Sequence, residues 1–258
     1  MKYFISILTA LTVFVLGACS SDESTVVGKD GKVVTSKYTK KITMPLHPCE
    51  HISREMLVNL FDVEESELEL NEDFLDPESY YAKCGYRWKK PNFEELEEKH
   101  RNAMMDYMMK GVSKKEGAKT SLSDVMKLES PYGSVSIGHF KQYDKMKSAV
   151  NQFTQLHRVP TKDDMAHLNK EIDKEFDEKK LDENSKKLGK ELSGGIASNM
   201  KFTEIDGIGD QAFFDHLDKS LDVRFGTFSF KVYIDSSQDF DSNVEIAKKI
   251  AQEVWDKL

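Results

Sequence analysis

The sequence lacks the short motifs that most directly indicate an enzymatic activity. It contains no HExxH zinc motif, no G-x-S-x-G nucleophile elbow and no phosphate-binding P-loop. Basic patches with interleaved aromatic residues are also missing, and acidic residues outnumber basic residues by 45 to 37. We therefore expect no nucleic-acid partner, no cofactor and no catalytic residue. Asp210, Asp215 and His216 are interpreted as surface charge, and a hydrolase with an unidentified active site is the alternative.

Long apolar runs are absent except at the N-terminus. Met1 and Lys2 precede an apolar run over residues 3–15, which is the order of a positive region and a hydrophobic region in an export signal. This run is shorter than the roughly 20 apolar residues that a membrane-spanning helix needs. The N-terminus therefore indicates export of the chain.

The apolar run leads into the sequence LGAC at residues 16–19, which resembles the lipobox of bacterial lipoproteins. The resemblance implies that residues 1–18 are a signal peptide that is cleaved before Cys19. It also implies that the Cys19 thiol receives a diacylglyceryl group, and several acyl chains hold a protein stably on a membrane. An ordinary secretory signal with an incidental cysteine is the alternative.

The residues after Cys19 indicate where the protein is anchored and how far its folded part extends. A residue other than Asp at the next position, here Ser20, resembles the outer-membrane sorting pattern of diderm bacteria. It implies a cell-envelope location, on the periplasmic or surface face of the outer membrane. Residues 19–41 are polar, so we expect the lipidated cysteine to be followed by a flexible tether. Residues 42–258 are then the ectodomain.

Cysteine is scarce, and only Cys49 and Cys84 remain once Cys19 is lipidated. Two cysteines in an exported chain suggest a disulfide bond. The bond would close a loop of about 36 residues and contribute roughly 3–4 kcal/mol in the chain-entropy model. Two free buried thiols are the alternative.

Apolar spacing and capping residues predict the helices. We expect them at residues 53–61, 92–110, 146–156, 163–192 and 242–258, with Ser53, Asn92 and Ser242 as N-caps. Residues 62–79 and 111–130 are expected to be loops. Strands are expected at residues 80–88 and at 135–139, where Val135, Ile137 and His139 alternate.

Residues 221–234 predict a hairpin most clearly. Apolar residues alternate on both sides of Gly226-Thr227, and glycine in the first turn position favours a type II′ turn. Phe225 would then face Phe228, and Asp222 would face Lys231 on the opposite side of the hairpin. The hairpin thus brings its apolar residues together on one face.

The fold class that these segments predict is α+β, an antiparallel sheet with helices packed on one face and charged helical insertions. A strand followed by a helix occurs at residues 133–157 and again at 228–257, which suggests two related halves. Cys49 at a helix start, CGYRW around Cys84, GIGDQAFF at 207–214, the hairpin and the last helix resemble exported lipoproteins and kinase sensor domains of actinobacteria. This resemblance covers residues 48–88 and 201–258 and implies a binding or sensing module of unassigned function. The glycines of GIGD are expected to form a turn.

Two clusters contain possible ligands for a soft metal. HPCEH contains His47, Cys49 and His51, and MMDYMM at residues 104–109 contains four thioethers at helical spacing. We expect the disulfide at Cys49 and core packing of the methionines, and hence no metal, with copper binding as the alternative. The protein is therefore expected to be a lipid-anchored envelope lipoprotein, a non-catalytic module that binds a small ligand or an envelope protein.

Overall fold

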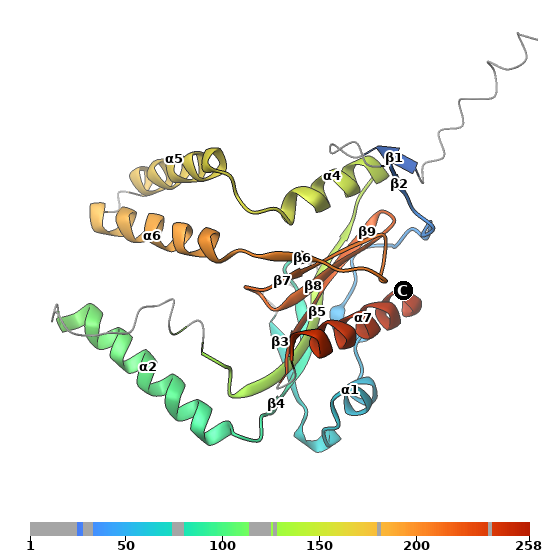
Figure 1. The fold of residues 1–258 in the computed structure, drawn as a ribbon, viewed down its shortest axis with the longest axis horizontal. Coiled ribbons are helices and arrows are strands. Elements are labelled where there is room, and N and C mark those ends of the chain that lie inside the picture. Colours follow the sequence, from blue (N-terminus) through green and yellow to red (C-terminus); the bar gives the residue numbers. More distant parts are fainter. Residues whose placement is uncertain are drawn as a thin grey trace, which may run out of the picture.

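The structure is a computed structural model that describes residues 25–27, 33–73, 80–113, 125, 128–179, 182–236 and 239–258. Cys19 and the expected signal peptide lie outside these residues. The described residues form six α-helices and a seven-stranded antiparallel sheet (Figure 1), which confirms the α+β fold class. Within these residues, no helix combines the length and apolar character needed to cross a membrane.

The main sheet has the strand order β3-β4-β5-β9-β8-β7-β6, and each strand is antiparallel to its neighbours. Its strands are β3 (Glu69–Asp73), β4 (Lys83–Lys89), β5 (Tyr132–Gln142), β6 (Phe202–Glu204), β7 (Gln211–Asp215), β8 (Ser220–Phe225) and β9 (Phe228–Asp235). A separate ribbon pairs β1 (Thr25–Val27) with β2 (Val33–Thr35). The acidic strand β3 lies in residues 62–79, a segment that we expected to be a loop. The strand was not predicted because its residues do not alternate in polarity.

The helices differ in how closely they follow the expected boundaries. They are α1 (Arg54–Phe61), α2 (Phe93–Ser113), α4 (Met146–Leu156), α5 (Lys162–Glu178), α6 (Glu183–Asn199) and α7 (Phe240–Lys257), with short 3-10 helices η1 (Pro48–Glu50) and η2 (Glu65–Glu67). The single charged helix expected at 163–192 is two helices that pack together. Ser242 does not cap α7, because the Asp239 carboxylate three residues earlier accepts its backbone N–H.

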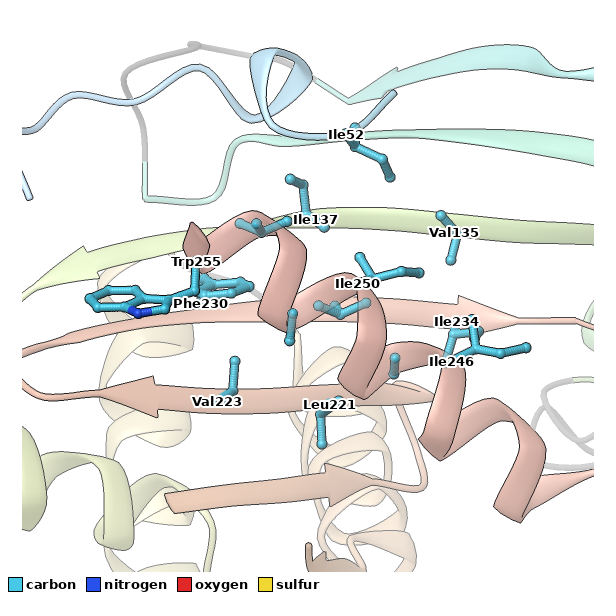
Figure 2. Packing of buried hydrophobic residues seen from close by; sticks show 14 of the residues in the cluster. Ile52, Val135, Ile137, Leu221, Val223, Phe230, Ile234, Ile246, Ile250 and Trp255 are labelled. Carbon is cyan, nitrogen blue, oxygen red and sulfur yellow. The ribbon is translucent and has the colours of Figure 1, made fainter. Parts of the chain in front are cut away.

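One face of the main sheet carries the hydrophobic core. The β8–β9 hairpin has the predicted register, with Phe225 opposite Phe228 and Gly226 at φ 60°. Its apolar face packs against α7, where the Trp255 ring stacks on Phe225 at 4.6 Å, and Ile250 is buried above the same sheet face (Figure 2). In Figure 1, α1 and α7 lie to the right of the sheet, and α2, α5 and α6 extend to its left.

The helix α4 lies over part of the opposite sheet face. Its Phe153 ring is 5.9 Å from Phe213, and Phe213 is paired with Asp222, which points away from α7. The strand–helix units β5–α4 and β9–α7 therefore place their helices on opposite sides of the sheet. The expected packing of helices on one face holds for α7, and α4 packs in addition on the opposite, polar face.

The regular alternation predicted for β5 ends at a β-bulge. The register of β5 with β9 shifts between Gly138 and Lys141, and His139 has a φ of 54°. Phe140 rather than His139 is buried in the core, with its ring 5.7 Å from Phe230. A bulge adds one residue to a strand and redirects a side chain, so the apolar ring enters the core and the imidazole turns to the polar face.

The sulfur atoms of Cys49 and Cys84 are 2.09 Å apart, which places them as a disulfide pair. Cys84 is buried in β4, and Cys49 lies in η1 directly before α1. The pair therefore joins the segment that leads into α1 to the sheet. It lies on the core face of the sheet, because Cys84 is paired with the buried Ile137.

Candidate functional site

The polar face of β8 and β9 contains a hollow of about 260 Å³, which we call the Asp222 pocket. It lies beneath the C-terminal end of α4 and beside the bulge of β5. Its walls combine seven aromatic side chains with a cluster of charged groups. The aromatic residues are Tyr80, Tyr81, His139, Tyr143, Phe153, Phe202 and Phe230, and the charged cluster comprises His157, Asp215, Asp218, Asp222 and Lys231.

A buried histidine–aspartate pair lies at the centre of the charged cluster. His157 and Asp222 are only 9% and 4% exposed. His157 Nε2 hydrogen-bonds to Asp222 Oδ2, and its Nδ1 lies 2.7 Å from the Phe153 carbonyl oxygen. A carbonyl can only accept, so Nδ1 carries a proton. The hydrogen bond between Nε2 and the Asp222 carboxylate contains one further proton. The pair has no net charge whether this proton is on Nε2 or on the carboxylate.

This pair is not arranged as the base of a Ser-His-Asp triad. In such a triad one imidazole nitrogen bonds to the aspartate and the other faces the nucleophile. The second nitrogen of His157 instead donates to the backbone of Phe153. The nearby Ser229 hydroxyl donates to the Tyr143 hydroxyl, at 3.4 Å. Both imidazole nitrogens are thus occupied, Nδ1 by the backbone of α4 and Nε2 by Asp222 of β8.

Lys231 provides the main positive charge in the pocket. Its Nζ is 3.2 Å from Asp222 Oδ2 and 3.6 Å from Asp218 Oδ2. Burial alone would lower the pKa of Lys231, but the charges of Asp222 and Asp218 raise it overall. Burial raises the pKa of Asp215, whose Oδ1 accepts the backbone N–H groups of Leu217 and Asp218.

The aromatic walls remain uncharged at neutral pH. Burial, with a smaller effect of the Asp222 charge, raises the pKa of Tyr80 to about 12. Burial, and then the charge of Lys231, lowers the pKa of His139 to about 4. The His139 ring meets those of Tyr80 and Tyr81 edge-on at 5.0 and 5.7 Å. Its Nδ1 is buried and has no hydrogen-bond partner among the described residues.

Most residues singled out in the sequence lie away from this pocket. Asp210 accepts the Gly226 backbone N–H at 2.7 Å and lies 3.4 Å from Arg224, so it supports the hairpin turn. His216 hydrogen-bonds to Thr203 at 2.8 Å. Asp210 and His216 therefore have separate structural partners, and only Asp215 belongs to the pocket. The interpretation as surface charge is wrong for Asp210 and Asp215, because both side chains are buried. Gly207 and Gly209 have positive φ angles, as expected for a turn.

The two possible soft-metal clusters have different outcomes. Cys49 is placed in the disulfide pair, and the described residues contain no group of three or more His, Cys, Asp or Glu side chains that could hold a metal ion. Core packing of the methionines is wrong: Met104, Met105, Met108 and Met109 are 41% to 64% exposed. The reason is that α2 packs on the sheet through its first turn, where Leu96 is buried and Phe93 contacts Tyr132.

The sequence contained one signal for the pocket, the predicted pairing of Asp222 with Lys231 in the hairpin. His157 lies 65 residues from Asp222, and Tyr80 comes from a different part of the chain. No periodic pattern links residues so far apart. Comparison of the chain with models of protein families, with curated proteins and with solved structures found no match.

Proposed function

We propose that this chain is an envelope lipoprotein, anchored through Cys19, that binds a small ligand in the Asp222 pocket. The observation that carries the proposal is the pocket itself, a hollow on a sheet face where aromatic rings surround buried charged groups. Ligand sites are typically concave and largely apolar, with a few placed polar groups. The bulge at His139 supports this assignment, because bulges often redirect side chains beside functional sites.

Binding without turnover fits this pocket better than hydrolysis. The phenol of Tyr80 has a raised pKa, so it is a poor base at neutral pH. His157 has both nitrogens engaged, and Lys231 lies close to two carboxylates. These groups hold one another in place, and their side chains line the hollow.

Retention of small molecules from a cell-envelope extract tests this proposal. The full-length protein, purified in detergent micelles, is mixed with the extract, separated from unbound molecules and examined by mass spectrometry. We expect a retained molecule with the wild type and with Ser198→Phe, a control on the exposed face of α6. Ser229→Phe, which places a ring in the pocket, should abolish retention.

Tyr81→Ala is a second variant, because Tyr81 is 70% exposed and its removal leaves the core intact. It should weaken retention even if Ser229→Phe does not fold, as judged by circular dichroism. Equal retention by the wild type, Ser229→Phe and Tyr81→Ala would contradict a ligand site in the Asp222 pocket. Retention of no molecule by the wild type would contradict it as well.

The exposed methionines of α2 favour a second candidate function, binding of Cu(I). Met104 and Met108 are four residues apart, and so are Met105 and Met109, so each pair lies on neighbouring turns of one helix face. Thioethers are soft ligands that select Cu(I), and methionine side chains are flexible enough to converge. Their exposure leaves this face accessible to an ion.

Competition with a colorimetric Cu(I) chelator tests the second candidate. We expect the wild type to withdraw Cu(I) from the chelator and the double variant Met104→Leu/Met108→Leu to lose this ability. Leucine keeps the apolar volume and removes only the sulfur, so an unchanged Cu(I) affinity would overturn the metal site. It would leave an apolar docking surface as the explanation for the exposed methionines.

A further inference from the structure

The charge of the Asp222 pocket is unbalanced. The His157–Asp222 pair is neutral overall, and Lys231 contributes one positive charge. Asp215 and Asp218, when ionised, contribute two negative charges, so the side chains that line the pocket sum to one negative charge. Asp218 is the accessible carboxylate, because its side chain is 50% exposed while Asp215 is buried.

The rings around this charge can also attract a cation. Tyr80, Tyr81 and His139 form a mutually edge-on cluster with ring centres 5.0 to 5.7 Å apart. Aromatic faces attract ammonium groups within about 6 Å. His139 is neutral at physiological pH, so it does not repel such a group.

Lysines of this chain already make the same type of contact beside the pocket. Lys141 Nζ is 4.7 Å from the Tyr143 ring centre and 5.9 Å from that of Tyr80. Lys231 is placed similarly, 5.9 Å from the Tyr233 ring. The aromatic surroundings of the pocket thus accommodate ammonium groups.

We infer that the Asp222 pocket binds the ammonium group of an organic cation, with Asp218 as its counter-ion and Tyr80 and Tyr81 as its aromatic wall. The inference deepens the proposed function and rests on it. An anionic ligand is disfavoured, because it would approach three aspartates while Lys231 is already shared between Asp218 and Asp222. A neutral ligand would make no use of the exposed Asp218 carboxylate.

Three probes of similar shape and different charge test this inference. They are 2-phenylethylammonium, 2-phenylethanol and phenylacetate, titrated into the full-length protein in detergent micelles by isothermal titration calorimetry at pH 7. We expect the cation to bind roughly tenfold more tightly than the alcohol, because one nearby opposite charge at a protein surface is worth a factor on this order. Phenylacetate should bind most weakly.

The variant Asp218→Asn keeps the size of the side chain and removes its charge. It should weaken binding of the cation about tenfold and leave binding of the alcohol unchanged. Asp256→Asn, on the exposed surface of α7, is the control and should change neither affinity.

The outcomes separate this inference from the proposed function. Equal affinities for the alcohol and the cation would contradict a cationic ligand and leave a ligand pocket in place. A cation affinity that is the same in Asp218→Asn and in the wild type would do so too. Failure of the cation to bind at millimolar concentration would also overturn the inference. The extract experiment would then decide, separately, whether the pocket binds any molecule.

Discussion

Asp210 and Arg224 form a buried charged clamp at the tip of the β8–β9 hairpin. Arg224 is fully buried, and its Nη1 donates to the Gly226 carbonyl at 2.6 Å and lies 3.4 Å from Asp210 Oδ2. Burial lowers the pKa of Arg224, and the charge of Asp210 partly offsets this effect. The Arg224 guanidinium and the Asp210 carboxylate therefore compensate each other's charge in the protein interior.

Replacing Asp210 with alanine should destabilise the protein strongly. The change leaves the Arg224 guanidinium buried without its counter-ion and removes the acceptor of the Gly226 N–H. We expect a loss of about 3–5 kcal/mol in the free energy of unfolding, measured by urea denaturation. Asp206→Ala, an exposed change in the same loop, is the control, and equal losses from both variants would refute the clamp.

His139 should make the stability of the protein depend on pH. Its pKa is about 4 in the folded protein and 6.5 as a free side chain. Between these values the unfolded chain binds a proton that the folded chain does not, so stability falls as the pH drops from 6.5 toward 4. Asparagine tolerates positive φ and does not titrate, so His139→Asn should reduce this loss.

Urea midpoints at pH 7 and pH 5 provide the measurement for His139. The difference between the two midpoints should be smaller in His139→Asn than in the wild type. His167→Asn removes an exposed histidine, whose side chain is 76% exposed, and should leave the difference unchanged. A wild-type difference retained in full by His139→Asn would show that other groups are responsible.

At the scale of elements, local patterns predicted the β8–β9 hairpin and missed the bulge of β5. The hairpin was predictable because its turn residues, apolar alternation and the Asp222–Lys231 pair all require one register. The bulge was not, because continued alternation through His139 satisfied the same local pattern. Only the packing of Phe140 against Phe230 in the assembled sheet decides which of the two residues is buried.

The same distinction applies to the candidate site. Its hairpin half was implied by Asp222 and Lys231. The other half consists of His157 and Tyr80, and these reach the pocket through the packing of α4 and the path of the chain before β4. Such long-range contacts follow from the tertiary fold, which local spacing does not encode.

The disulfide pair should stabilise the attachment of η1 and α1 to β4. Cys49 and Cys84 are 35 residues apart in sequence, so the bond should contribute about 3–4 kcal/mol through loop closure. Non-reducing peptide mapping of protein from the envelope should find the two peptides linked, and urea unfolding in reductant should show the loss. Free thiols at both positions would disprove the pairing.

At the scale of the whole molecule, the proposed anchor makes a direct prediction. Cys19→Ala should abolish labelling by an alkynyl fatty acid and release the protein from the membrane fraction, because the thiol is the site of lipid attachment. Cell fractionation and gel fluorescence measure the two effects. A variant that stays labelled and membrane-bound would rule out lipidation at Cys19.

The end of the expected tether is held against the ectodomain. Ser36 is buried, and the Tyr38 ring lies 4.9 Å from Phe225 and 5.6 Å from Trp255. A side chain at Gly226 would collide with the Tyr38 carbonyl oxygen. The chain therefore leaves the ectodomain beside the turn of the β8–β9 hairpin.

This attachment shortens the free stretch of chain between the proposed lipid on Cys19 and the folded ectodomain. Thr25 is paired with Thr35, so the chain doubles back on itself and residues 25–35 add little reach. With the lipid on Cys19, only about six residues remain to span the distance, at most about 20 Å when fully extended. The ectodomain would then stay close to the headgroups with its hairpin turn toward the bilayer, rather than extend outward on a long stalk.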